Sequence, residues 1–123
     1  MTFTIDYPET SAGKKQWAWE YGLNALYSGK HWAKRQKDSQ FWHHLVHAEL
    51  MRQSIPKDIF KKPFVITFYW DDRLDIDNHA YIGKMIVDAL KGWVITDDNK
   101  RRFKGVSHWY HNERCIRVIV EEV

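Results

Sequence analysis

Two short acidic segments carry the side chains of this chain that are best suited to chemistry. The first is Asp75-Ile76-Asp77-Asn78, and the second, about twenty residues later, is Asp97-Asp98. Carboxylates that gather without a counter-charge repel one another, so such a group indicates a bound cation. Mg²⁺ and Mn²⁺ prefer oxygen ligands, and Mg²⁺ commonly takes one or two carboxylates and leaves its other positions to water and phosphate. The two segments therefore predict a metal site that acts on phosphate esters.

The spacing within the first segment is favourable for holding one ion. Asp75 and Asp77 are two residues apart, and in an extended chain two such side chains leave on the same face. Lys84 and Asp88 follow Asp77 by seven and eleven residues, which places all three nearly in line along one side of a helix. We therefore expect a polar row that faces away from the apolar stripe of the same helix.

The second segment is expected to supply a third carboxylate. A turn at residues 96–99, returning through a strand beside the first, would bring Asp98 to the same ion, and Asp98 is preferred over Asp97. Asp75, Asp77 and Asp98 are thus the predicted metal ligands, for one or two Mg²⁺ or Mn²⁺ ions. Lys84 is predicted to place its charge on the developing oxyanion. The predicted reaction is hydrolysis of a phosphodiester.

The same patterns also have structural explanations. Asp-x-Asp-Asn is typical of a helix N-cap, and Asp-Asp-Asn is typical of a turn. A lysine on an exposed helix face is usually a solvated charge. A calcium loop is excluded more clearly, because residues 71–78 lack the alternating Asp/Asn ligands, the glycine and the terminal Glu.

A zinc site is a further alternative, since His43 and His47 are one helical turn apart, with His44 and Glu49 nearby. The sequence offers no third ligand of suitable spacing, no HExxH pattern and no Cys pair. We expect instead an exposed helix face that contacts DNA phosphate.

The elements that must position these residues follow from hydrophobic periodicity. One α+β domain, residues 1–123, is predicted, with a mixed or antiparallel sheet of about four to five strands packed with two main helices. The predicted strands are residues 2–7, 63–70, 93–95, 103–111 and 115–121, and the predicted helices are residues 32–52 and 78–91.

Details of these elements can also be predicted. β-branched and aromatic residues dominate both faces of the strand at 63–70, so both faces should be covered. The last two strands are joined by the turn at residues 112–113. Residues 8–29 are expected to be irregular. The apolar side of the first helix should consist of Phe41, Trp42, Leu45, Ala48 and Met51.

Composition is consistent with a cytosolic protein. The 123 residues are 44% hydrophobic, which is enough for one core, and the single Cys115 excludes an intrachain disulfide. No apolar run has membrane-spanning length, and residues 1–7 lack the features of a signal peptide.

Basic segments indicate a polyanionic partner. The formal net charge is +3, and two segments without acidic residues lie on either side of the acidic ones in sequence. Trp32 and Phe103 lie within these segments and could stack on exposed bases, while Trp42, Trp70 and Trp93 are assigned to the core or a dimer interface. The predicted DNA contacts are Lys30, Lys34, Arg35, Lys37, Lys100, Arg101, Arg102 and Lys104.

From about Phe64 onward the sequence resembles the RusA family of Holliday-junction resolvases, small phage and prophage endonucleases. The family signature runs Asp-x-Asp-Asn, then Lys, then Asp-Ala-Leu, then Asp-Asp. The matching residues here are Asp75, Asp77, Asn78, Lys84, Asp88-Ala89-Leu90 and Asp97-Asp98. The resemblance implies a homodimeric α+β fold, dependence on Mg²⁺ or Mn²⁺, and paired nicks across four-way DNA junctions in recombination and repair.

The resemblance also implies roles for individual residues. The essential carboxylates would be Asp75, Asp77 and Asp98, with Lys84 assisting. Candidates to support them are Asp97, Asp88, Asn78 and His79. One departure is the stretch 79–83, which is about three residues longer than in the best-known members, close to one extra helical turn.

Two other functions compete with a junction resolvase. One is a non-catalytic DNA-binding or regulatory protein of the same fold, in which the carboxylates serve as caps and turns. The other is a nuclease that acts on other branched DNA or flaps.

Overall fold

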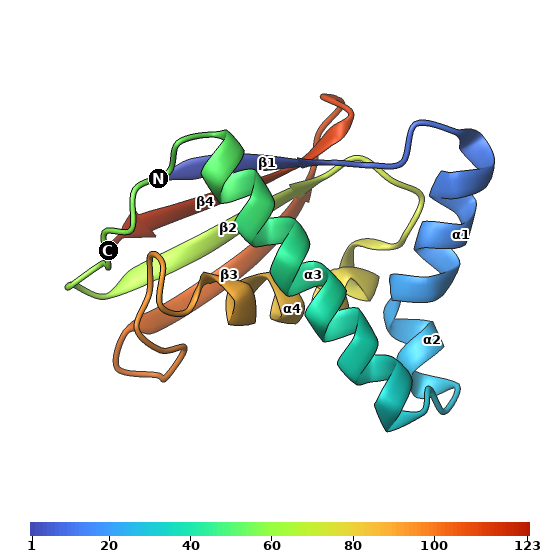
Figure 1. Ribbon diagram of the computed structural model, residues 1–123, viewed down its shortest axis with the longest axis horizontal. Helices are drawn as coiled ribbons and strands as arrows, with labels where there is room; N and C mark the ends of the chain where they lie inside the picture. The colour runs from blue at the N-terminus through green and yellow to red at the C-terminus, as the bar shows by residue number, and fades with distance from the viewer.

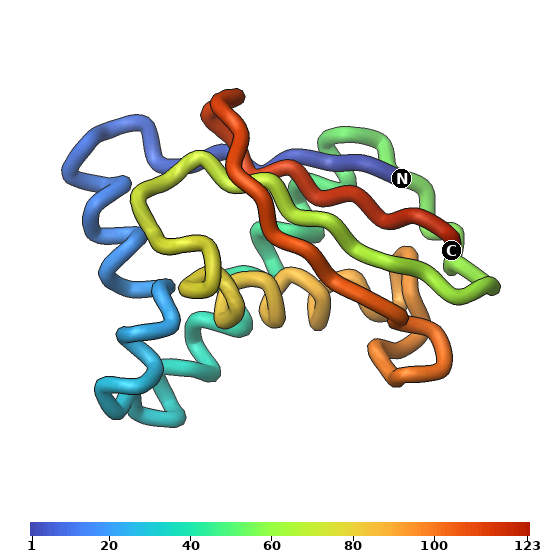
Figure 2. Tube along the Cα trace, turned by 180° about the vertical axis from the view of Figure 1, so that it is seen from behind, coloured from blue at the N-terminus to red at the C-terminus, as the bar shows by residue number.

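The strands and helices form two layers. The computed structural model describes all 123 residues, and in it a four-stranded sheet is covered on one face by the helices α3 (Trp32–Arg52) and α4 (Ala80–Leu90) (Figure 1). No helix covers the other face, which is turned to the viewer in Figure 2. Two shorter helices, α1 (Ser11–Tyr21) and α2 (Leu23–Tyr27), lie at one end of the sheet. The predicted α+β class with a mixed sheet is confirmed.

The sheet combines antiparallel and parallel pairs. Its strands are β1 (Thr2–Asp6), β2 (Phe64–Trp70), β3 (Phe103–Tyr110) and β4 (Cys115–Glu122), arranged in the order β1-β4-β2-β3. β4 is antiparallel to both of its neighbours, whereas β3 is parallel to β2. Parallel strands need a crossover connection, and α4 lies within the one that joins β2 to β3. The acidic segment after β2 is thus placed at the start of this crossover.

β2 is confirmed, but only one of its faces is fully covered. Its side chains alternate strictly between buried and half-buried positions. The buried set points toward the helices and the other set toward the uncovered face of the sheet, because successive side chains of a strand alternate. The expectation that both faces are covered is therefore wrong. The buried residues are Phe64, Ile66, Phe68 and Trp70.

The short strand predicted at residues 93–95 is absent. The chain instead folds back tightly after α4, and the amides of Trp93, Val94 and Ile95 lie 3.1, 3.1 and 3.3 Å from the Leu90 carbonyl oxygen. Gly92 permits this turn because its φ of 81° is in the left-handed region. The three residues after it are buried, which explains why their apolar run resembled a strand.

The last two strands are present at their predicted positions but are not paired with each other. β2 lies between them, bonded to β3 on one side and to β4 on the other. The connection crosses the end of β2, where the His111 amide donates to the Trp70 carbonyl over 2.9 Å. The short connection between β3 and β4 suggested that these strands pair directly. The crossover through α4 instead makes β3 parallel to β2, and β4 pairs with the opposite side of β2.

Residues 8–29, expected to be irregular, contain α1 and α2. The Thr10 side chain caps α1 by accepting a hydrogen bond from the Gly13 amide at 2.9 Å. Trp17 and Tyr21, one turn apart, are the buried residues of α1 and pack edge to face at 6.0 Å. The glycines obscured this helix in the sequence because glycine weakens a helical pattern.

α3 begins and ends close to its predicted limits, but its buried face differs from the predicted one. Trp42, Val46 and Leu50 are fully buried at intervals of four, whereas Phe41 is 52% and Met51 69% exposed. The apolar count pointed to a face rotated toward Phe41 and Met51. The observed face also includes the buried Asp38, one turn before Trp42, and a search for apolar periodicity does not detect an acidic residue.

α4 matches its prediction most closely. Its apolar stripe is buried, and the helix is preceded by a 3-10 turn, η1 (Ile76–His79). No helix of the structure combines the length and apolar character needed to cross a membrane. The buried stripe consists of Ile82, Met85, Ile86, Ala89 and Leu90.

Candidate functional site

The first acidic segment forms a turn rather than an extension of β2. Asp75 immediately precedes η1 and Asp77 lies within it, and the Asn78 amide closes the turn on the Asp75 carbonyl at 2.9 Å. The expectation that the two side chains share a face of an extended chain is therefore wrong. The turn begins early because Asp-x-Asp-Asn favours a helix start over continued extension.

The carboxylates of Asp75 and Asp77 have no partner within the protein. Both side chains are exposed, and neither accepts a hydrogen bond or forms an ion pair. Asp75 stands at the N-cap position of η1 but makes no side-chain capping bond. An N-cap acid normally accepts a backbone amide, so capping does not account for this carboxylate. Both acids keep all their oxygen lone pairs available.

The other predicted residues meet on the exposed side of α4. Lys84 Nζ lies 3.5 Å from Asp88 Oδ1 and 3.9 Å from Asp98 Oδ2. The turn after α4 has thus brought Asp98 to the lysines of the helix, whereas the sequence analysis expected it beside Asp75 and Asp77. Lys84 and Asp88 are one helical turn apart and point away from the buried stripe.

Lys91 is a member of this group that the sequence analysis missed. Its Nζ lies 3.3 Å from Asp88 Oδ1 and 3.2 Å from Asp98 Oδ1, so it bridges the helix and the following turn. Its spacing of three from Asp88 and seven from Lys84 was a signal that it shares their face. Two lysines and two aspartates alternate here in a nearly neutral cluster.

Asp98 and Asp97 have different surroundings. Burial opposes ionisation of Asp98, but the hydrogen bond and charge of Lys91 outweigh it, so the pKa of Asp98 is lowered. Asp97 is exposed, and its carboxylate accepts the Asp98 amide at 2.7 Å and the Asn99 side-chain amide at 3.3 Å. Turn formation therefore explains Asp97 fully but leaves Asp98 facing the lysines.

A three-ligand metal centre is not assembled in this structure. No group of three or more His, Cys, Asp or Glu side chains is arranged to hold one ion. The donor set of Asp75 and Asp77 still fits Mg²⁺, which needs only one or two carboxylates when water and phosphate complete its coordination. Asp98 is engaged by Lys91 and does not join that pair.

Tyr110, at the end of β3, lies beside the first acidic segment. Its hydroxyl donates to the Leu74 carbonyl. Burial and then the charges of Asp72, Asp75 and Asp77 raise its pKa, which places all three carboxylates in its electrostatic neighbourhood. Strand pairing of β2 with β3 brings this residue here, so no local pattern in the sequence indicates it.

Of the supporting candidates, His79 is the one whose position is unexpected. It is completely buried, and its ring contacts Asp72 rather than any of the predicted ligands. Asn78 is half-buried, and Asp88 belongs to the lysine cluster described above.

The predicted DNA contacts divide into exposed and internal groups. Lys30 is internal, because its ammonium pairs with the buried Asp38 and lies over the rings of Tyr21 and Tyr81, at 5.4 and 5.2 Å from their centroids. Its side chain is only 9% exposed, so the expectation that it contacts DNA is wrong. The basic run does not form a uniform surface, because Lys30 precedes α3 and its ammonium points to Asp38 on that helix.

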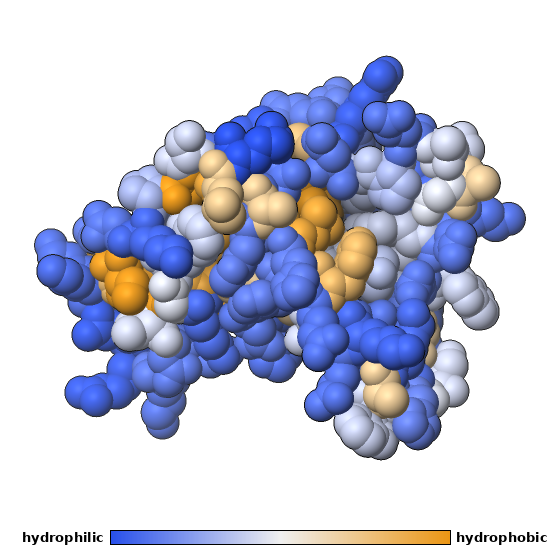
Figure 3. Space-filling view, in the orientation of Figure 1, coloured by the Kyte–Doolittle hydropathy of each residue, from blue (hydrophilic) through white to orange (hydrophobic).

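The remaining basic residues lie nearer the surface. Lys34 is half exposed but pairs with Glu20, and Arg102 donates to the Lys61 carbonyl. Hydrophilic side chains cover most of the helical face of the molecule (Figure 3). The predicted contacts that are exposed and have no ion pair are Arg35, Lys37, Lys100, Arg101 and Lys104.

The histidines of α3 do not form a zinc site. The rings of His43 and His47 approach to 4.0 Å between centroids, but His47 Nε2 is engaged with the Ala89 carbonyl oxygen at 2.7 Å. This contact ties α3 to α4.

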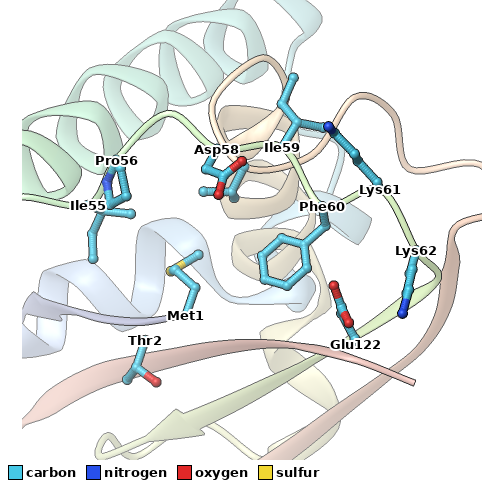
Figure 4. A pocket seen from close by; sticks show the side chains of 11 residues that line it. Met1, Thr2, Ile55, Pro56, Asp58, Ile59, Phe60, Lys61, Lys62 and Glu122 are labelled. Carbon is cyan, nitrogen blue, oxygen red and sulfur yellow. The ribbon is translucent and has the colours of Figure 1, made fainter.

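A large cavity lies remote from all these groups. It has a volume of about 710 Å³ and lies beside both chain termini, at the opposite end of β2 from the acidic turn (Figure 4). Met1, Phe60 and Val94 contribute to its lining, and none of the predicted site residues does.

Comparison with known proteins identifies no relative. The sequence matches no protein-family model, and a search of curated proteins finds no significant match.

Proposed function

We propose that this chain is a metal-dependent, structure-specific endodeoxyribonuclease that resolves Holliday junctions by paired symmetric nicks. The observation that carries the proposal is the unpartnered state of Asp75 and Asp77, two exposed carboxylates on one turn. The resemblance of the acidic and lysine motifs to the RusA family supplies the substrate. The corresponding process is recombination or repair of DNA, and the gene would be carried by a phage or prophage.

The chemistry proposed for the site is hydrolysis assisted by Mg²⁺ or Mn²⁺. Asp75 and Asp77 would hold the ion, which supplies a Lewis acid for the phosphate and lowers the pKa of water. Lys84, with its side chain 70% exposed, can place its ammonium against a phosphate oxygen. Asp98 is proposed as the third ligand from its place in the sequence and from the family resemblance, and its ion pair with Lys91 would open for that role.

The partner proposed is branched DNA bound by a homodimer. A four-way junction has two-fold symmetry, so two copies related by a two-fold axis could cut strands of like polarity. Exposed cations such as Arg35 and Lys37 would contact phosphate, and Trp32, which is 59% exposed, is accessible for stacking on an unpaired base.

The test is cleavage of a synthetic four-way junction in the presence of Mg²⁺. We expect paired nicks from the unmodified protein and their loss in Asp77→Asn, while Asp58→Asn, which changes an exposed acid next to the large cavity, retains activity. Asp77→Asn should also bind the junction more tightly in metal-free buffer, because it removes a charge that repels phosphate. Comparison with flaps and duplexes would identify a broader branched substrate.

A non-catalytic DNA-binding protein is the second candidate. The observation that favours it is the absence of three converging metal-ligating side chains. It predicts metal-independent junction binding without nicks, and equal behaviour of Asp77→Asn and Asp58→Asn in the cleavage assay.

A further inference from the structure

The turn that carries Asp75 and Asp77 is attached to a buried polar cluster that the proposed chemistry does not use. The cluster consists of Tyr7, Asp72 and His79, and we refer to it as the loop clamp. His79 is 0% and Tyr7 7% exposed, and the Asp72 side chain is 8% exposed. Tyr7 directly follows β1, Asp72 lies in the segment after β2, and His79 is the last residue of η1.

His79 is held through both of its ring nitrogens. Nε2 lies 2.8 and 3.0 Å from the two carboxylate oxygens of Asp72, and Nδ1 lies 3.0 Å from the Ile76 carbonyl oxygen. The ring also stacks on Trp70, with centroids 4.2 Å apart and planes 23° apart. Rotation of the ring would break these contacts, so its position is fixed by the hydrogen bonds together with the stacking on Trp70, the last residue of β2.

Asp72 connects His79 to the rest of the clamp. Its Oδ2 accepts the Tyr7 hydroxyl at 2.7 Å, and its Oδ1 accepts the Leu74 amide at 3.0 Å. The Tyr7 hydroxyl accepts in turn from the Asp71 amide at 3.0 Å. Burial and then the charge of Asp72 raise the pKa of Tyr7, so the hydroxyl keeps its proton and remains a donor.

The contact with Ile76 gives the clamp its consequence for the site. Ile76 lies between Asp75 and Asp77 in the chain, so the bond from His79 to its carbonyl fixes the peptide between the two acids. Asp72 fixes the chain on the other side of Asp75 through the Leu74 amide. The free carboxylates are therefore attached to a backbone held on both sides.

We propose that Tyr7, Asp72 and His79 are positioning residues that set the geometry of Asp75 and Asp77 for a divalent cation. This inference rests on the proposed function of that pair. Apolar residues could fill the same volume without the cost of desolvating a carboxylate and an imidazole. Residues that hold metal ligands in position without contacting the metal have large effects on metal affinity. Such a role would explain why a buried polar cluster lies next to Asp75 and Asp77.

The test uses Tyr7→Phe, which removes one oxygen and keeps the ring that packs on Trp17 at 5.0 Å. The matched control is Tyr21→Phe, a buried tyrosine that also packs on Trp17 but makes no hydrogen bond to the turn. The measurements are the Mg²⁺ concentration for half-maximal junction cleavage, the affinity for Mn²⁺ from its electron paramagnetic resonance signal, and the melting temperature.

We expect Tyr7→Phe to weaken metal binding by about threefold to tenfold, and His79→Leu by about tenfold or more, with Tyr21→Phe unchanged. His79→Gln keeps a donor in the ring's place and should recover part of the affinity. Folded Tyr7→Phe protein with unchanged metal affinity would overturn the inference and leave the clamp a purely structural feature.

Failure of the proposed function gives a different result. If the unmodified protein neither binds Mn²⁺ nor cleaves any branched DNA, the metal site itself is refuted, and the positioning role with it. Hydrogen exchange then still reports on the turn: the amides of Leu74 and Asn78 should exchange faster in Tyr7→Phe than in Tyr21→Phe. Equal exchange in the two variants would show that Tyr7 does not restrain the turn, and would refute the loop clamp whether or not a metal binds.

Discussion

The buried ion pair of Lys30 and Asp38 allows a prediction that separates stability from DNA binding. The Asp38 side chain is 2% exposed and also accepts the Tyr81 hydroxyl at 2.8 Å. It therefore joins the start of α3 to the start of α4. The variant Asp38→Leu removes both contacts and leaves the Lys30 ammonium buried.

The structure allows the magnitude to be estimated. Removing one partner of a buried pair typically costs about 3–5 kcal/mol. Lys30 keeps some compensation here, because Nζ donates to the Glu20 carbonyl at 2.6 Å and lies over two tyrosine rings. We therefore expect the lower end, about 3 kcal/mol, in the free energy of unfolding of Asp38→Leu.

The assay is urea denaturation of four proteins: the unmodified chain, Asp38→Leu, Lys30→Met and the double variant. The double variant should be more stable than the sum of the single changes predicts, because it leaves no unpaired buried charge. Strictly additive losses would refute the reasoning. Lys30→Met should also leave the salt dependence of junction binding unchanged, because the ammonium it removes does not face solvent.

Three further predictions follow from individual residues. Lys91→Met should raise the pKa of Asp98, measured by carboxyl NMR titration, and an unshifted titration would contradict this. Since the pKa of Asp98 is lowered in the folded protein, the unmodified chain should be more stable than the variant above pH 3.8, and this difference should vanish as the pH falls through the lowered pKa. Arg35→Met should lower the slope of log K against log salt for DNA binding by about one and leave the melting temperature unchanged, and an unchanged slope would remove Arg35 from the interface. Gly92→Ala should lower the free energy of unfolding by about 1 kcal/mol, because φ is 81° there and no neighbour would clash with the added carbon; a neutral result in urea denaturation would contradict a requirement for the left-handed conformation.

The parts of the fold that follow from local periodicity were predictable. β2, α3 and α4 carry strong patterns of period two or 3.6, and their observed limits lie close to the predicted ones. The failures depend on other forces. The strand-like run after Gly92 became a turn because three amides share the Leu90 carbonyl, and β3 and β4 separated because β2 pairs with both.

The candidate site was predictable to the same extent. Lys84 and Asp98 approach each other because a helix face meets the turn after it, both of which are local features, but the expected meeting of Asp98 with Asp75 and Asp77 is not seen. Contacts across the chain were not predictable, because no local pattern encodes them. Tyr7 and Asp72 are 65 residues apart in sequence, and Lys30 meets Tyr81 only when α4 packs on α3.

Four aspartates between residues 71 and 77 provide an internal comparison for the function of this segment. Asp71 accepts the Arg114 amide at 2.8 Å, and Asp72 binds Tyr7, Leu74 and His79, so folding alone accounts for both. The carboxylates of Asp75 and Asp77 bind no protein group.

This division leads to an experiment that separates the two explanations of the acidic motif. If the segment needed acids only as caps, Asp75 and Asp77 should accept amides as Asp71 and Asp72 do, and replacement of Asp77 by Asn would cost stability. Because Asp77 has no partner, we expect Asp77→Asn to leave the free energy of unfolding unchanged or slightly raised, through relief of repulsion among the carboxylates. The same substitution should abolish metal-dependent cleavage. A marked loss of stability in urea denaturation would show that the acid serves the fold, and the proposal of a metal ligand would lose its foundation.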